Sequence, residues 1–240
     1  MKHIVKQKEP PSFTAWKAKA NDDWQPTYSD LRNPEKRDVL QALLQEQGHI
    51  CCYCGMRLTA RDPSMSNDQE SETNDQTSAQ DGCHIEHLKP QSQYPEFALD
   101  YDNMLASCQA EDTKNPRLPL RCGQKKANWY DPTLMVSPLM PDCETFFRYT
   151  GSGEILPSDD PSKHEVAKTT IQELGLDITR LNSLRKRAIA TIDEQIIGTS
   201  EEDIVNSALD LISTYDIHDP AGMFSPFCFV VVSYLKANYL

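Results

Sequence analysis

Residues 49–58 read HICCYCGMRL, and this cysteine-rich segment decides how the rest of the chain is interpreted. Cys51 and Cys54 are separated by two residues, so one tight turn can present both thiolates to a single tetrahedral ion. A structural zinc site needs a second pair, and Cys108 and Cys122 are the natural candidates because each lies at the end of a short predicted element. Thirteen residues separate this second pair, which departs from the usual compact spacing. The pattern predicts a structural Zn²⁺ site with these four ligands.

Two alternatives stay open for the cysteines. The four could be unrelated buried thiols, or Cys52 could replace Cys51 as a ligand, although C-x-C closes a site less easily than C-x-x-C. The chain has eight cysteines, at positions 51, 52, 54, 83, 108, 122, 143 and 228. No sequence feature indicates secretion, so we expect no disulfides, and we expect the other cysteines to be reduced and partly buried.

Between the two cysteine pairs lies CHIEHLKP (residues 83–90), which we expect to form a strand. Alternate residues of a strand share a face, so His84 and Glu86 should point together and His87 oppositely. Near the strand end this alternation can relax, and we expect Glu86 and His87 to converge on one cleft. A carboxylate suits Mg²⁺ or Mn²⁺, and an imidazole can take a proton from water near neutral pH. The pair indicates metal-assisted phosphodiester hydrolysis, with a second zinc site or a surface strand as alternatives.

Four features follow one another along residues 49–130: the C-x-x-C pair, Glu86-His87, Asn103 in YDNMLASC, and Cys122 before a short basic helix. This order resembles the HNH endonuclease family in its zinc-knuckle form, whose ββα-metal fold surrounds one catalytic cation. The resemblance implies that Glu86 is a ligand of a catalytic Mg²⁺ or Mn²⁺ ion and that His87 is the general base. It also implies that Asn103 orients His87 through a backbone or side-chain hydrogen bond.

One position departs from the family pattern. Many members carry a metal-binding histidine directly after the last zinc cysteine, where this chain has Gly123. A further metal ligand is then left open between Asn128, on the next helical turn, and His84 from the strand. The departure concerns the coordination of the metal more than the class of reaction.

Four longer stretches of the sequence resemble one group within this family. EQGHICCYCG, HIEHLKPQSQYPEFALDYDNMLASC, CGQKKANWYDP and RYTGSGEILP are similar to the PtuB-type HNH subunits of Septu anti-phage systems, and related subunits accompany certain retrons. The resemblance implies an effector subunit that cleaves DNA or RNA together with a PtuA-like ABC/SMC-type ATPase. In a retron setting, a reverse transcriptase and the retron nucleic acid would be further partners. The alternative is a non-catalytic zinc-binding adaptor that couples the ATPase to nucleic acid.

The net charge bears on how nucleic acid would be held. The chain has 24 basic and 36 acidic residues, a formal net charge of −12, and proteins that grip nucleic acid unaided usually carry a basic face. The candidate contacts are basic residues that flank the predicted cleft, with a solvated surface as the alternative interpretation. They are Lys89, Arg121, Lys125 and Lys126, together with Lys114 and Arg117. A partner would supply the contacts that this chain lacks.

The whole chain predicts an α+β protein in which a zinc-stapled ββα-metal HNH core is flanked by an N-terminal arm and a C-terminal helical bundle. Residues 1–34 form the arm, residues 35–130 the HNH module with a disordered insertion at 62–82, and residues 131–240 a hairpin plus helices. We expect helices near 13–20, from Pro34 to Gln47 with Asn33 as the cap, after Cys122 as far as Asp131, and near 162–174, 178–197, 201–214 and 223–238. A short strand should follow the cysteine turn, and FFRYTGSGEILP (146–157) should form the hairpin.

Two further expectations concern the ends of the chain. No stretch approaches the roughly 20 apolar residues of a membrane helix, and MKHIVKQKEPPSF lacks the apolar core of a secretory signal, so we expect a cytoplasmic protein. The C-terminal helices should complete the core or, by the resemblance, dock to the ATPase.

Overall fold

The computed structural model describes residues 1–59, 82–108, 119–196 and 200–240. Residues 62–81 of the predicted insertion, and the candidate contacts Lys114 and Arg117, lie outside the described residues. The described elements are α1 (Pro11–Lys17), α2 (Glu35–Glu46), β1 (Cys83–His87), β2 (Met104–Cys108), α3 (Cys122–Lys126), β3 (Phe147–Tyr149), β4 (Ile155–Pro157), α4 (Pro161–Glu173), α5 (Thr179–Asp193), α6 (Glu201–Tyr215) and α7 (Cys228–Asn238).

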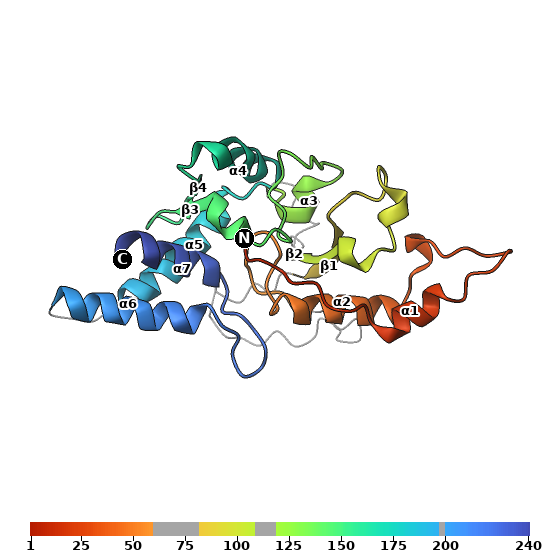
Figure 1. Cartoon of the computed structure of the whole chain (residues 1–240), viewed down its shortest axis with the longest axis horizontal. Helices are drawn as coiled ribbons and strands as arrows, with labels where there is room; N and C mark the ends of the chain where they lie inside the picture. Colours follow the sequence, from red (N-terminus) through yellow and green to blue (C-terminus); the bar gives the residue numbers. More distant parts are fainter. Residues whose placement is uncertain (60–81, 109–118, 197–199) are drawn as a thin grey trace.

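The centre of the molecule is a ββα unit made of β1, β2 and α3. The two strands pair antiparallel, with Cys83 opposite Cys108 and His87 opposite Met104. Figure 1 shows α3 and α2 on opposite sides of this hairpin, and both helices contact β2. All five residues of β2 are therefore buried, as expected for a strand that is covered on both faces. The described residues form a mixed structure of helices and two small antiparallel sheets, which is compatible with the predicted α+β class.

Several residues of the N-terminal segment pack on the core. Phe13 and Trp16 of α1 are buried, and α1 contacts α2. Ile4 is also buried, and its backbone N–H donates to the carbonyl of Pro138 at 2.9 Å. The predicted arm therefore contributes apolar side chains to the core.

Several predicted boundaries are wrong, for local reasons. The N-cap of α2 is Pro34 and no side chain caps it, so Asn33 does not have the predicted role. Helix α3 ends at Lys126, before the predicted Asp131, because Ala127 has a φ of +47°. In place of the short strand after the cysteine turn there is one bridge, between Ile50 and Arg57.

The C-terminal third has the predicted hairpin and helices, but α5 ends at Asp193, before the predicted residue 197, and the start of α7 moves. β3 pairs antiparallel with β4. Helix α7 begins at Cys228 instead of residue 223, because Phe227 adopts a φ of +59° that helices do not use. Val230, Val231 and Leu235 of α7 are completely buried, and α7 contacts α5, α6 and β3. In the part of the chain that the structure describes, we find no helix long and apolar enough to cross a membrane.

Candidate metal centre and adjoining polar site

Four buried cysteines meet at one point of the ββα unit. The Sγ atoms of Cys51, Cys54, Cys108 and Cys122 all lie within 4.8 Å of one another. Two come from the turn after α2, one from the end of β2 and one from the start of α3. The Sγ atoms of Cys54 and Cys108 are 3.8 Å apart, which matches the edge of about 3.8 Å in a tetrahedron with Zn–S bonds of about 2.3 Å. The predicted cluster is confirmed as a site that could hold a metal ion such as zinc.

Neighbouring groups hold the cluster in place. The backbone N–H of Cys108 donates to Cys51 Sγ at 3.3 Å, and Ser107 Oγ lies 3.8 Å from the same sulfur. Cys52 is buried outside the cluster, and burial raises the pKa of its thiol well above the usual value. All eight cysteines are free thiols, so no disulfide competes with metal binding.

Gln47 is a buried anchor that the sequence analysis did not identify. Its amide nitrogen donates to the carbonyls of Ile50 and Ala106, both at 2.9 Å, and its amide oxygen accepts from the N–H of Ala106 at 2.7 Å. These bonds join the end of α2 to the cysteine turn and to β2. A glutamine at the end of a helix carries no sequence signal that distinguishes this role.

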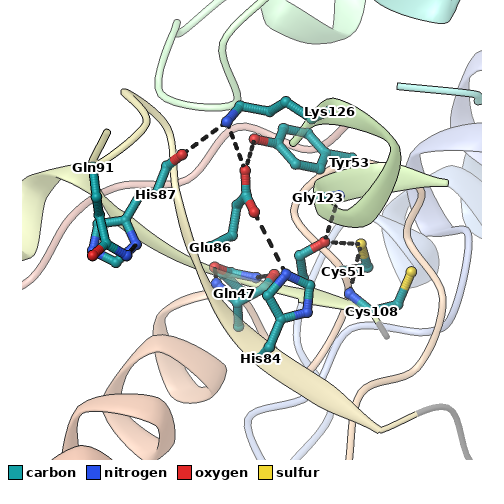
Figure 2. Close-up of polar contacts among 12 residues, drawn as sticks. Gln47, Cys51, Tyr53, His84, Glu86, His87, Gln91, Cys108, Gly123 and Lys126 are labelled. Atoms are coloured by element: carbon teal, nitrogen blue, oxygen red, sulfur yellow. Dashed lines mark hydrogen bonds and ion pairs between the residues drawn. The ribbon is translucent and has the colours of Figure 1, made fainter. Parts of the chain in front are cut away.

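His84 and Glu86 lie side by side on the face of β1 that looks toward α3 (Figure 2). His84 Nε2 is 3.5 Å from Glu86 Oε2. The other carboxylate oxygen, Oε1, accepts from Lys126 Nζ at 2.9 Å and from the hydroxyl of Tyr53 at 3.3 Å. Burial opposes ionisation of Glu86, but hydrogen bonding with His84 and the Lys126 ammonium together hold the pKa of this carboxyl below its usual value. Glu86 is therefore a buried, ionised carboxylate.

Gly123 makes room for this pair. A Cβ at position 123 would lie 2.3 Å from Glu86 Oε2 and 2.8 Å from His84 Nε2, so no larger residue fits without moving them. The N–H of Gly123 donates to Ser107 Oγ at 3.2 Å, which fixes the start of α3 against β2. The imidazole and the carboxylate therefore fill the position that a side chain at residue 123 would occupy. Glu86 and His84 are the side chains here that could hold a divalent cation.

His87 lies on the opposite face of β1, so the expected convergence of Glu86 and His87 is wrong. β1 stays regular through His87, which pairs with Met104, and the alternation of side chains therefore does not relax. The His87 residue is only 6% exposed, and the ring of Tyr28 packs edge-on against it with 4.6 Å between centroids. Figure 2 shows the imidazole of His87 turned away from Glu86.

Both ring nitrogens of His87 are hydrogen-bonded. Nε2 lies 3.0 Å from the carbonyl oxygen of Ala98, which can only accept, so Nε2 carries the proton. Nδ1 lies 3.0 Å from the amide nitrogen of Gln91, which must then donate to it. Burial lowers the pKa of His87 below its usual value, and the hydrogen bond to Ala98 offsets this only in part. The ring is neutral near pH 7, with its lone pair on Nδ1.

Asn103 holds the loop that follows β1. Its side-chain oxygen accepts from the N–H of Lys89 at 2.8 Å, and its amide nitrogen donates to the carbonyls of Lys89 at 3.0 Å and Phe97 at 3.1 Å. These bonds go to backbone groups, not to the imidazole of His87. Phe97 directly precedes Ala98, whose carbonyl binds His87, so Asn103 positions the ring through the loop.

The structure corrects the set of basic residues predicted to contact nucleic acid. Arg121 and Lys126 are 1% and 2% exposed, respectively, so neither can meet a polymer at the surface. Lys125 is exposed, and Lys89 is half-buried with its Nζ 3.7 Å from the centroid of the Phe97 ring. Asn128 is exposed beyond the end of α3, and the residue beside Glu86 on the ligand face is His84 instead.

Comparison of the chain with protein-family models gives no match, and a search of curated proteins gives none either.

Proposed function

We propose that the protein is a divalent-cation-dependent endonuclease of the HNH type. The observation that supports this proposal is the pairing of His84 and Glu86 beside Gly123, inside a ββα unit whose ends meet at a four-cysteine cluster. Hydrolysis of a phosphodiester needs a positive charge close to the phosphate oxygens, and a cation held by these two side chains would supply it.

Three residues of the chain have further roles in this proposal. Glu86 is kept ionised and oriented by Lys126 and Tyr53, so that Oε2 faces His84. By the resemblance His87 is the candidate base, and its neutral ring has a lone pair on Nδ1 that can take a proton from water. Its imidazole faces away from Glu86, so this role requires the ring to turn toward the face of β1 that holds the cation ligands. This role requires the Gln91 amide, which now donates to Nδ1, to give way to that water. Asn103 donates to the carbonyl of Phe97 and so keeps the neighbouring carbonyl of Ala98 in place, which accepts from Nε2 of His87.

The biological setting in this proposal is an anti-phage complex. The similarity to PtuB-type subunits suggests a PtuA-like ATPase as the partner and DNA or RNA as the substrate, with a reverse transcriptase and retron nucleic acid as optional additions. The net charge of −12 and the burial of two of the candidate basic contacts both favour a partner that holds the nucleic acid.

Cleavage by the full chain, assembled with the proposed ATPase partner, tests the proposal. Labelled DNA and RNA are incubated with Mg²⁺ or Mn²⁺, and Glu86→Gln should lower the cleavage rate by at least about a hundredfold, since it removes the only charged ligand. Glu96→Gln, an exposed charge on the loop after β1, is the matched control and should retain activity. Equal cleavage by the Glu86→Gln complex and the wild-type complex would refute the nuclease assignment.

A second candidate function is a non-catalytic adaptor that links the ATPase to nucleic acid. The burial of His87 and the engagement of both its ring nitrogens favour this alternative, because a base must reach water. His87→Ala separates the two functions: the nuclease proposal expects loss of cleavage, whereas the adaptor expects unchanged cleavage by the assembled complex.

A further inference from the structure

Lys126 is a buried cation at the site where a divalent cation would bind. Its Nζ lies 2.9 Å from Glu86 Oε1 and 2.9 Å from the carbonyl oxygen of His87, and the residue is 2% exposed (Figure 2). A buried ammonium is costly unless an opposite charge and further acceptors compensate it. Glu86 provides that charge, and the carbonyl of His87 provides the second acceptor.

Lys126 cannot easily leave this position. Helix α3 begins at Cys122, one turn earlier, and Cys122 belongs to the four-cysteine cluster. The N–H of Gly123 is also bonded to Ser107 of β2. The ammonium is thus held by a short helix that is fastened at its start, not by a mobile surface segment.

The charges of the site cancel in this arrangement. Glu86 supplies the carboxylate and Lys126 the ammonium, and Tyr53 and His84 also make polar contacts with Glu86. The affinity of a protein site for a divalent cation rises with the number of uncompensated carboxylates. A site with one carboxylate and an adjacent ammonium attracts a free cation weakly.

We propose that Lys126 is the internal counter-ion of the candidate cation site. Its ammonium balances Glu86 when no cation is bound, orients Oε2 toward His84, and lowers the affinity of the site for a divalent cation alone. The inference rests on the proposed function in taking His84 and Glu86 as the cation ligands. Under that function, the anionic phosphodiester supplies the negative charge that a stably bound cation requires, so the cation is retained together with its substrate.

Titration of the zinc-loaded full chain with Mn²⁺ alone, followed by the electron paramagnetic resonance signal of free Mn²⁺, tests the proposal. The wild-type protein should bind with a Kd on the order of 10⁻⁴ M or weaker. Lys126→Met, which keeps the length of the side chain and removes its charge, should tighten binding at least about tenfold. Lys126→Arg should stay close to wild type. Lys125→Met is the matched control, because it removes an exposed charge from the same helix and should change Kd by less than about twofold.

Unchanged or weaker Mn²⁺ binding by a Lys126→Met protein that retains its zinc overturns the proposal. So does tighter binding that persists after Glu86→Gln is added, because the ion would then sit elsewhere. If Lys126→Met loses its zinc, the Mn²⁺ titration of the wild-type protein decides between the outcomes. A wild-type Kd for Mn²⁺ below about 10⁻⁵ M would contradict the proposal, because a site weakened by its own counter-ion cannot bind so tightly.

The two proposals fail separately. Mn²⁺ binding is measured without any substrate, so the expected tightening together with an inactive complex would refute the nuclease and leave the role of Lys126 intact. Cleavage that depends on Glu86, with no effect of Lys126→Met on Mn²⁺ binding, would refute the role of Lys126 and leave the nuclease proposal intact.

Discussion

Gly123 and Glu86 approach each other so closely that a Cβ on residue 123 would lie 2.3 Å from Glu86 Oε2. The contact arises because α3 packs directly on β2, and because the N–H of Gly123 is bonded to Ser107 Oγ. Glu86 cannot simply swing aside, since Lys126 and Tyr53 hold its other oxygen. Gly123 replaces the metal-binding histidine that many HNH proteins carry here. Because no larger residue fits, glycine is also required for Glu86 and His84 to lie where they do.

Gly123→Ala should displace the Glu86 carboxylate and destabilise the protein by about 1–3 kcal/mol, as overpacking of a filled site does. Mn²⁺ binding should weaken at the same time. Chemical denaturation and Mn²⁺ titration measure the two effects. Gly151→Ala is the control, because a Cβ there would meet Tyr234 only at 3.7 Å and should be tolerated. A Gly123→Ala protein with wild-type stability and Mn²⁺ binding would show that Glu86 is free to move.

The parts of the fold with strong local signals were predictable from the sequence. The spacing of Cys51 and Cys54 indicated a turn that presents both thiolates to one ion, and all four predicted ligands do meet. The hairpin at 146–157 and the four C-terminal helices carry clear turn and periodicity signals, and the structure contains each of them. The turn, the hairpin and the helices depend on residues close together in the chain, so one sequence is enough to find them, and the second cysteine pair follows from the need of a zinc site for four ligands.

The environment of the candidate site was less predictable, because distant residues determine it. Lys126 looked like a surface cation in a basic run, but its partner Glu86 lies 40 positions earlier and buries it. Strict alternation of side chains along β1 predicts the face on which His87 lies. The expected departure from alternation at the end of the strand does not occur. Tyr28 and Gln91, which cover the ring, come from segments with no pattern that points to it.

Removal of one cluster cysteine should cost the metal and much of the stability. Cys108→Ser should lower the zinc content from about one ion per chain to near zero and lower Tm by at least about 10 °C, because the cluster joins the cysteine turn, β2 and α3. Zinc analysis and thermal unfolding provide the measurements. Cys83→Ser, a half-buried thiol at the start of β1 and outside the cluster, should keep both zinc content and Tm. Full zinc retention by Cys108→Ser would mean that the ion is held by other residues.

Asn103→Ala should destabilise the protein by about 1–2 kcal/mol, because it leaves partly buried backbone groups of Lys89 and Phe97 without their partner. Denaturant unfolding measures the change in the free energy of unfolding. Asn128→Ala is the control, since Asn128 is exposed beyond α3, and its effect should stay within about 0.5 kcal/mol. Equal stability of the two variants would indicate that the loop after β1 does not depend on the Asn103 amide.

The stability of the protein should fall as the pH drops below about 6.5, and His87 should account for part of this fall. Burial lowers the pKa of His87 in the folded chain, so between the folded and unfolded pKa values the unfolded chain binds more protons. The contribution is therefore complete above the unfolded value and is lost as the pH falls through the lowered one. The free energy of unfolding at pH 7.5 and pH 5.5 gives the difference directly.

His87→Gln isolates this contribution. The variant should be less stable than wild type at pH 7.5, because it disturbs the contacts with Ala98 and Gln91, but it should lose less stability on going to pH 5.5. Some dependence should remain, because burial and the nearby Arg57 also lower the pKa of His49. His164→Gln, at an exposed position of α4, should leave the wild-type difference unchanged. A His87→Gln protein with the full wild-type loss would mean that the ring is already accessible to protons in the folded state, and this accessibility would itself favour its use as a base.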